Sequence, residues 1–171
     1  MKDFTDLLIW ATSQIGREFF DFPVHHLGDE VYRERVYCYE LYHLLRSRWP
    51  NSKYQINGEV DKRNHPYFTE RGWIKPDLLV HVSRTSENYA VIEVKTSNAT
   101  KAGLIEDLQH LDIFLTKIEC PYDRAIMLIL GNDASKKSRS IESYKSAGHI
   151  EVWIHESAGK AAELTKTFLL E

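Results

Sequence analysis

Residues 89–97 read YAVIEVKTS, and their apolar run predicts a strand packed inside a sheet. One carboxylate, Glu93, interrupts the run, and one lysine, Lys95, closes it. Because side chains alternate along a strand, Glu93 and Lys95 point to one face, while Ile92 and Val94 point to the other. The pair is therefore either an ion pair at the edge of a sheet or two parts of one site.

The segments on either side of this strand alternate between helical and extended patterns. Helices are predicted where apolar residues recur at steps of three and four, over 3–20, 30–48, 101–118 and about 135–147. Further strands are predicted over 53–60, 73–82, 124–130 and 149–155, and residues 158–170 fit either a helix or a strand. The order α-α-β-β-β-α-β-α-β predicts one α/β domain over 1–171, with a mixed sheet flanked by helices.

Composition narrows the classes of function. The 171 residues include 22 Lys and Arg against 25 Asp and Glu, a net charge of −3 that argues against non-specific coating of nucleic acid or of an anionic membrane. A local basic groove is still compatible with this charge. No apolar stretch approaches the ~20 residues of a membrane span. The two cysteines lack metal-type spacing, so we expect a reduced, cytoplasmic protein.

A second carboxylate lies one predicted hairpin before the first. Asp77 precedes Glu93 by sixteen positions, with the turn-forming SRTSEN between them, so two antiparallel strands can bring the acids together. Adjacent carboxylates repel each other unless a cation lies between them, and Mg²⁺ is commonly held by one or two carboxylates plus water. Lys95 on the same face would orient a water molecule or offset charge on phosphorus. The set predicts metal-assisted phosphodiester hydrolysis.

The simpler reading of Glu93 and Lys95 is a solvated ion pair that contributes under ~1 kcal/mol. Such pairs are common on strands. The apolar residues Ala90, Val91 and Ile92 make a fully solvated face harder to accept, and the acid at position 77 favours a shared site.

Pro76-Asp77 followed by Glu93-Val94-Lys95 resembles the motif of the PD-(D/E)XK nuclease superfamily, which includes restriction endonucleases. The elements predicted between about 30 and 131 also follow that family's α-β-β-β-α-β core. The resemblance implies a restriction endonuclease-like fold and a Mg²⁺-dependent DNA endonuclease in which Mn²⁺ can substitute. It implies Asp77, Glu93 and the Val94 carbonyl as metal ligands, with Lys95 as the catalytic lysine.

Many members of this family add a glutamate from the first core helix. Glu40 is the first choice here, because it lies in an aromatic and apolar run where a lone carboxylate is costly unless it is paired or coordinating. Its alternative role is an ion pair with a basic residue on a neighbouring turn. Glu34, between two arginines, favours an exposed role, and Glu59 at the end of a predicted strand is a rival.

Candidate nucleic-acid contacts lie in and before the helix that follows the motif. Gln109 matches a position at which some family members turn a glutamine toward the site, and Asp107 is the alternative inward polar residue. Ser97, Asn98 and Lys101 lie near the start of this helix, where backbone N–H groups favour anions.

A later basic cluster that includes Lys136 and Lys137 would hold a DNA backbone, although basic loops are more often simply solvated. The chain has no recognisable helix-turn-helix or zinc finger, so specificity would come from loops, from a homodimer or from a partner protein. The alternative function is a catalytically silent domain of the same fold that binds nucleic acid or assembles with other proteins.

Overall fold

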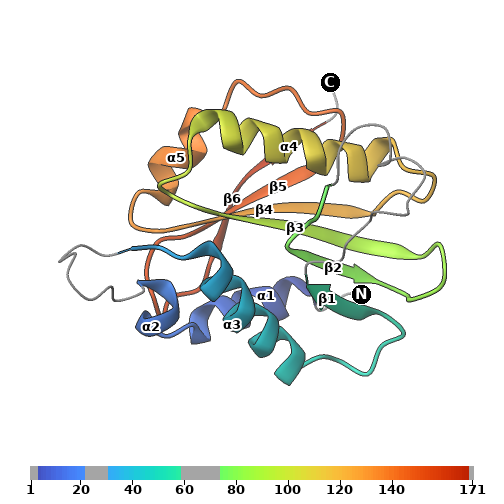
Figure 1. Ribbon diagram of the computed structural model, residues 1–171, viewed down its shortest axis with the longest axis horizontal. Helices are drawn as coiled ribbons and strands as arrows, with labels where there is room; N and C mark the ends of the chain where they lie inside the picture. The colour runs from blue at the N-terminus through green and yellow to red at the C-terminus, as the bar shows by residue number, and fades with distance from the viewer. Residues whose placement is uncertain (1–3, 22–30, 59–73, 170–171) are drawn as a thin grey trace.

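The protein is built on one six-stranded mixed sheet with its strands in sequence order (Figure 1). The computed structural model describes residues 4–21, 31–58 and 74–169. Its strands are β1 (Gln55–Gly58), β2 (Leu78–His81), β3 (Asn88–Thr96), β4 (Arg124–Leu130), β5 (Ile150–His155) and β6 (Glu163–Phe168). Strands β1, β2 and β3 are antiparallel, β3, β4 and β5 are parallel, and β6 is antiparallel to β5.

Helices cover both faces of the sheet (Figure 1). They are α1 (Phe4–Gln14), α2 (Arg17–Phe20), α3 (Glu34–Ser47), α4 (Lys101–Thr116) and α5 (Ala134–Ser140). The first three lie on one face, and α4 and α5 lie on the other. From α3 to β4 the elements follow the predicted order α-β-β-β-α-β, so the expected mixed sheet flanked by helices is confirmed.

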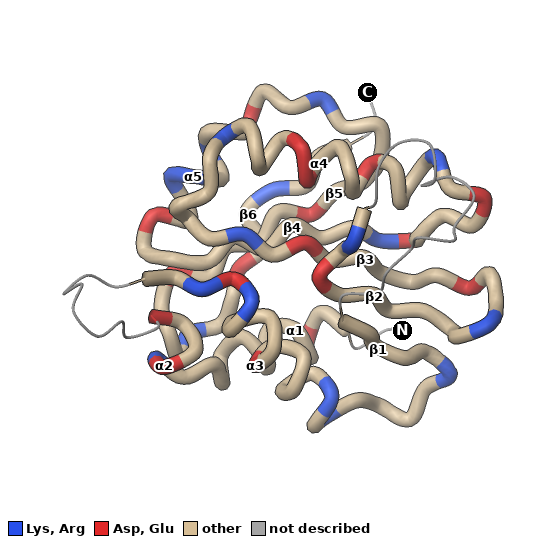
Figure 2. The backbone as a smooth tube through the Cα atoms, viewed as in Figure 1, with Lys and Arg blue, Asp and Glu red and all other residues tan. Residues whose placement is uncertain are grey.

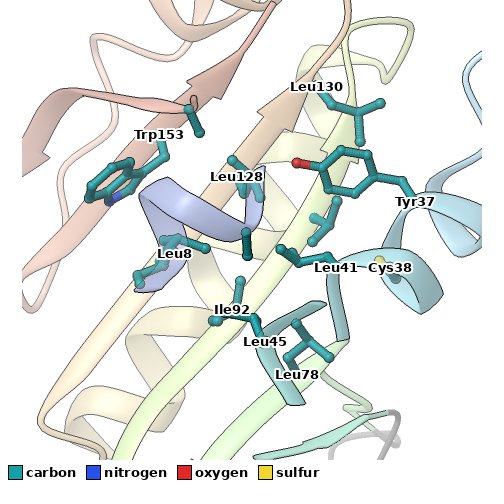
Figure 3. Packing of buried hydrophobic residues seen from close by; sticks show 14 of the residues in the cluster. Leu8, Tyr37, Cys38, Leu41, Leu45, Leu78, Ile92, Leu128, Leu130 and Trp153 are labelled. Atoms are coloured by element: carbon teal, nitrogen blue, oxygen red, sulfur yellow. The ribbon is translucent and has the colours of Figure 1, made fainter. Parts of the chain in front are cut away.

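The central strands separate two apolar cores. Ile92 and Val94 of β3 pack into the core beneath α1 and α3, whereas Val91 packs into the core beneath α4. In Figure 3, Leu8 of α1 and Leu41 of α3 lie close to Ile92. Both faces of β3 are therefore covered by apolar side chains.

Two boundaries differ from the sequence-based prediction because of backbone chemistry. The single helix predicted over 3–20 is broken at Gly16, which caps α2 in an extended conformation (φ −70°, ψ 163°). Glycine favours such a position because it is a poor residue for the interior of a helix. The strand predicted from residue 73 begins only at Leu78, because Pro76 has no N–H group for the strand ladder.

Two further differences lie beyond β4. Helix α5 ends at Ser140, short of the predicted 147, because Ser146 and Ala147 bond to Asp112 of α4 instead. The Ser146 hydroxyl and the Ala147 N–H donate to Oδ1 of Asp112 at 2.7 and 3.0 Å. The segment that fitted either a helix or a strand forms β6.

The C-terminal end of helix α1 and the residue after it are hydrogen-bonded to the segment between β5 and β6. The Ala162 N–H donates to Oγ1 of Thr12 at 2.9 Å, and the Gly159 N–H donates to the carbonyl of Ile15 at 3.0 Å. Residues separated by almost the whole chain are therefore in direct contact.

None of the helices in the described ranges has the length and apolar character needed to cross a membrane.

Candidate active site

The hairpin of β2 and β3 brings Asp77 to Glu93. Leu78 pairs with Ile92 in this antiparallel register, so one further step places Asp77 opposite Glu93. Oδ2 of Asp77 accepts a hydrogen bond of 2.8 Å from the Val94 N–H. This bond fixes one carboxylate at the point where β2 begins.

Lys95 joins three elements at this point. Its Nζ lies 3.2 Å from Oε1 of Glu34, the first residue of α3, and 3.5 Å from Oδ2 of Asp107 on α4. Figure 2 shows acidic and basic positions on the middle of the sheet between these two helices. Sequence positions 34, 77, 93, 95 and 107 therefore converge on one cluster.

Burial dominates the electrostatics of the acids. It raises the pKa of Asp77 to about 6, although the hydrogen bond from the Val94 N–H opposes the shift. Burial also raises the pKa of Glu93 well above its usual range, and the neighbouring Asp77 and Asp107 raise it further. For Asp107, burial raises the pKa to about 6 while Lys95 lowers it. The cluster holds more negative charge than one lysine offsets, which suits a cation.

Lys95 is a permanent ammonium in this setting. Burial lowers its pKa, but the charges of Asp107, Glu34, Asp77 and Glu93 raise it more, so the net shift is upward. The side chain can therefore donate hydrogen bonds and offset negative charge at neutral pH, but it cannot accept a proton.

Cys38 of α3 lies beside the cluster, and its role was not foreseen from sequence. Burial raises the pKa of its thiol, and the negative charges of Asp77 and Glu34 raise it further. Both effects favour the neutral thiol over the thiolate, which is the nucleophilic form. Cys38 lies four positions after Glu34, a spacing that places both residues on one face of a helix. This spacing is the feature of the sequence that could have indicated the position of Cys38.

The acid that α3 brings to Lys95 is Glu34, not Glu40. Six helical positions separate the two glutamates, which puts Glu40 about 9 Å farther along the axis and about 120° around it. Glu34 shares its face with the buried residues Cys38, Leu41 and Leu45. The Glu34 side chain is 36% exposed, in the direction that its flanking arginines favoured, but it also forms an ion pair with Lys95. The rival Glu59 lies outside the described residues.

Of the two polar candidates in α4, Asp107 and not Gln109 faces Lys95. Asp107 is buried and contacts Lys95, whereas Gln109 is exposed. Oδ2 of Asp107 has no hydrogen-bond partner within the described part of the chain, although it lies in ion-pair range of Nζ. Gln109 therefore does not take the inward position that the resemblance implied for it.

The predicted phosphate contacts divide into two groups. Ser97, Lys136 and Lys137 line one small pocket at the end of β3. Asn98 and Lys101 are exposed and do not line it.

The described residues offer few protein ligands for a metal ion, as is typical of Mg²⁺ sites. Across the described ranges, no group of three or more His, Cys, Asp or Glu side chains is arranged to hold an ion. Two interacting carboxyl groups, those of Asp77 and Glu93, remain available, with the Val94 carbonyl as a candidate third ligand. Mg²⁺ is commonly bound by one or two carboxylates, with water and substrate phosphate completing its shell.

Comparison of the chain with protein-family models, with curated proteins and with solved structures finds no match. The proposals below therefore rest on the residues and their geometry.

Proposed function

We propose that the protein is a metal-dependent nuclease that hydrolyses DNA phosphodiester bonds. The observation that carries the proposal is the convergence of Asp77, Glu93 and Lys95, with Oδ2 of Asp77 bonded to the Val94 N–H and Nζ of Lys95 held by two further acids. An excess of buried and half-buried carboxyl groups beside one ammonium suits a divalent cation and an anionic substrate together.

Each side chain has a distinct role in this proposal. Asp77 and Glu93 hold the metal ion, with Mg²⁺ as the expected ion and Mn²⁺ as a substitute. When bound, the ion supplies an activated water and offsets charge on the phosphate. Lys95 donates hydrogen bonds to the water or to a phosphate oxygen, because it stays protonated. Glu34 and Asp107 position its ammonium group from opposite sides of the sheet.

The finer fold assignment is part of the same proposal. The α-β-β-β-α-β order from α3 to β4, with the acids on β2 and β3, supports a restriction endonuclease-like core. Specificity then comes from loops, from a second copy of the chain or from a partner protein.

The direct test is cleavage of single-stranded, duplex and branched DNA by purified protein with Mg²⁺ or Mn²⁺. Asp77→Asn, Glu93→Gln and Lys95→Ala should each lower the rate by about a hundredfold or more, because the first two weaken the hold on the ion and the third removes a positive charge beside the reacting phosphate. Lys117→Ala, at the exposed far end of α4, is the matched control and should cleave at the normal rate. Cleavage that survives all three site substitutions would contradict the proposal.

One observation favours a second function, a catalytically silent domain that binds nucleic acid or assembles with other proteins. Lys95 is held by Glu34 and Asp107, as in a purely structural ion-pair network. Calorimetric titration with Mg²⁺ separates the two functions, since a silent domain should take up no ion at the cluster.

A further inference from the structure

A small pocket of about 160 Å³ lies at the end of β3, beyond the acidic cluster. Its lining consists of Ser97, Asp133, Lys136, Lys137 and Ser140. The side chains come from the segment after β3, from α5 and from Asp133, which directly precedes α5; the parallel pairing of β3 with β4 brings these segments together.

Ser97 leaves an unused hydrogen-bonding group in this pocket. Its backbone N–H donates to the carbonyl of Leu130 at 2.6 Å, which continues the ladder between β3 and β4. The residue is only 6% exposed, and its hydroxyl makes no hydrogen bond within the described part of the chain. Because Ser97 lines the pocket, this hydroxyl can donate a hydrogen bond to a ligand atom there.

The two lysines give the pocket a net positive charge. Nζ of Lys137 donates to the carbonyl of Ala99 at 2.5 Å, which fixes the ammonium group and leaves two of its three donors for a ligand. Lys136 is exposed and forms no ion pair within the described ranges. Asp133 offsets one of the two positive charges. The hydroxyl of Ser140 donates to the carbonyl of Lys137 at 2.6 Å and holds the turn of α5 that carries the lysines.

The pocket lies close to the acidic cluster along the chain. Ser97 follows Lys95 by two residues and lies just past the end of β3, so the two residues are at most about 7 Å apart along the chain. At an axial rise of about 3.4 Å per nucleotide in one strand, the pocket is close enough to bind a phosphate next to the bond that is cut.

We propose that the pocket formed by Ser97, Lys136 and Lys137 binds a phosphate group of the nucleic-acid strand next to the bond that is cut. A fixed ammonium group, a second exposed one and a hydroxyl donor match the acceptor oxygens of a phosphate. The nucleic-acid source of this phosphate rests on the proposed function, whereas the phosphate chemistry of the pocket does not.

The first test measures binding of fluorescein-labelled DNA, single-stranded and duplex, in EDTA so that no cleavage occurs. Ser97→Ala should weaken binding about fivefold without changing the melting temperature, because the hydroxyl has no partner within the described chain. Lys136→Ala should weaken binding about tenfold and reduce the salt slope of binding by about 0.9. Lys117→Ala is the control and should bind as the unchanged protein does. Equal affinity in all four proteins overturns the proposal.

The second test uses inorganic phosphate and does not depend on nuclease activity. In an NMR titration of the unchanged protein, the amide signals of Ser97 and Lys136 should shift and saturate, and the shifts should be lost in Ser97→Ala. Absence of these shifts overturns the pocket, even if the protein cuts DNA. Saturating shifts in a protein that neither binds nor cuts DNA support the phosphate pocket and overturn the proposed nuclease.

Discussion

Asp77 is half-buried beside another carboxyl group, and the free energy of unfolding therefore depends on its ionisation. Its pKa is raised to about 6 from the ordinary 3.8, chiefly by burial. Between these two pH values the folded protein keeps a proton that the unfolded chain releases. Linkage then makes stability fall as pH rises from about 4 to about 6, and the loss persists at neutral pH.

The first prediction concerns this pH dependence. In EDTA, Asp77→Asn should raise the free energy of unfolding at pH 7, by up to about 3 kcal/mol, and change it little at pH 4. The amide oxygen can still accept from the Val94 N–H, so the local geometry is kept. Urea unfolding at the two pH values measures the difference. A variant that is less stable than the unchanged protein at pH 7 would show that the carboxylate is favourably placed without metal.

The second prediction separates the two glutamates of α3. Glu34→Gln should lower the rate of DNA cleavage by about tenfold or more, because Lys95 loses the partner that orients it. The unfolding free energy should change by less than about 1 kcal/mol, since the pair is partly exposed. Glu40→Gln on the same helix is the control. Equal rates in Glu40→Gln and Glu34→Gln would remove Glu34 from the site.

At the scale of elements, α3 is joined to the sheet by a buried polar contact as well as by its apolar face. The Tyr37 hydroxyl and Nδ1 of His155, the last residue of β5, share a hydrogen bond of 2.8 Å. Burial lowers the pKa of His155 to about 4, so its ring is neutral at pH 7. In Figure 3 the Tyr37 ring projects from α3 into the core.

The third prediction tests this joint between α3 and β5. Tyr37→Phe should destabilise the protein by about 1–3 kcal/mol, because it leaves a buried ring nitrogen without that partner. Tyr39→Phe, on the exposed side of the same helix, should change stability little. Urea unfolding of both variants at pH 7 is the measurement. Equal stability of the two variants would mean that water replaces the lost hydroxyl.

The elements also show which features a sequence can predict. Strand β4 was predicted at the residues where it occurs, because a continuous apolar run is diagnostic of a buried central strand. The pattern of β6 is compatible with either a helix or a strand, because this edge strand buries only its last residue, Phe168.

The same contrast holds for the candidate site. Asp77, Glu93 and Lys95 could be predicted together because they lie on one hairpin, where local register fixes their separation. The choice of Glu34 over Glu40 could not, because it depends on how α3 is rotated against the sheet. Tertiary packing sets that rotation.

At the scale of the whole molecule, charge at the cluster should couple metal binding to global stability. A cation that binds only the folded protein raises its unfolding free energy by mass action, by about 2.7 kcal/mol at a hundred times its dissociation constant. The cluster contains four acids, which come from α3, from the residue before β2, from β3 and from α4. A bound cation would reduce the repulsion among them, and the effect would reach elements on both faces of the sheet.

The fourth prediction is that Mg²⁺ raises the melting temperature progressively with concentration. Calorimetry at constant ionic strength measures the shift. The double variant Asp77→Asn, Glu93→Gln should lose the shift, because both proposed ligands are neutral. An equal shift in the double variant would place the bound ion elsewhere.

The bonds from Thr12 and Ile15 to residues 162 and 159 have a consequence for biosynthesis. The Thr12 contact spans 150 positions, and contacts so distant in sequence form late in folding. At a synthesis rate of about 5–20 residues per second, α1 waits roughly 8–30 s for this partner after it is translated. During that interval Leu8 and Ala11 lack part of their final burial, so we expect the nascent chain to depend on chaperones until β6 has left the ribosome.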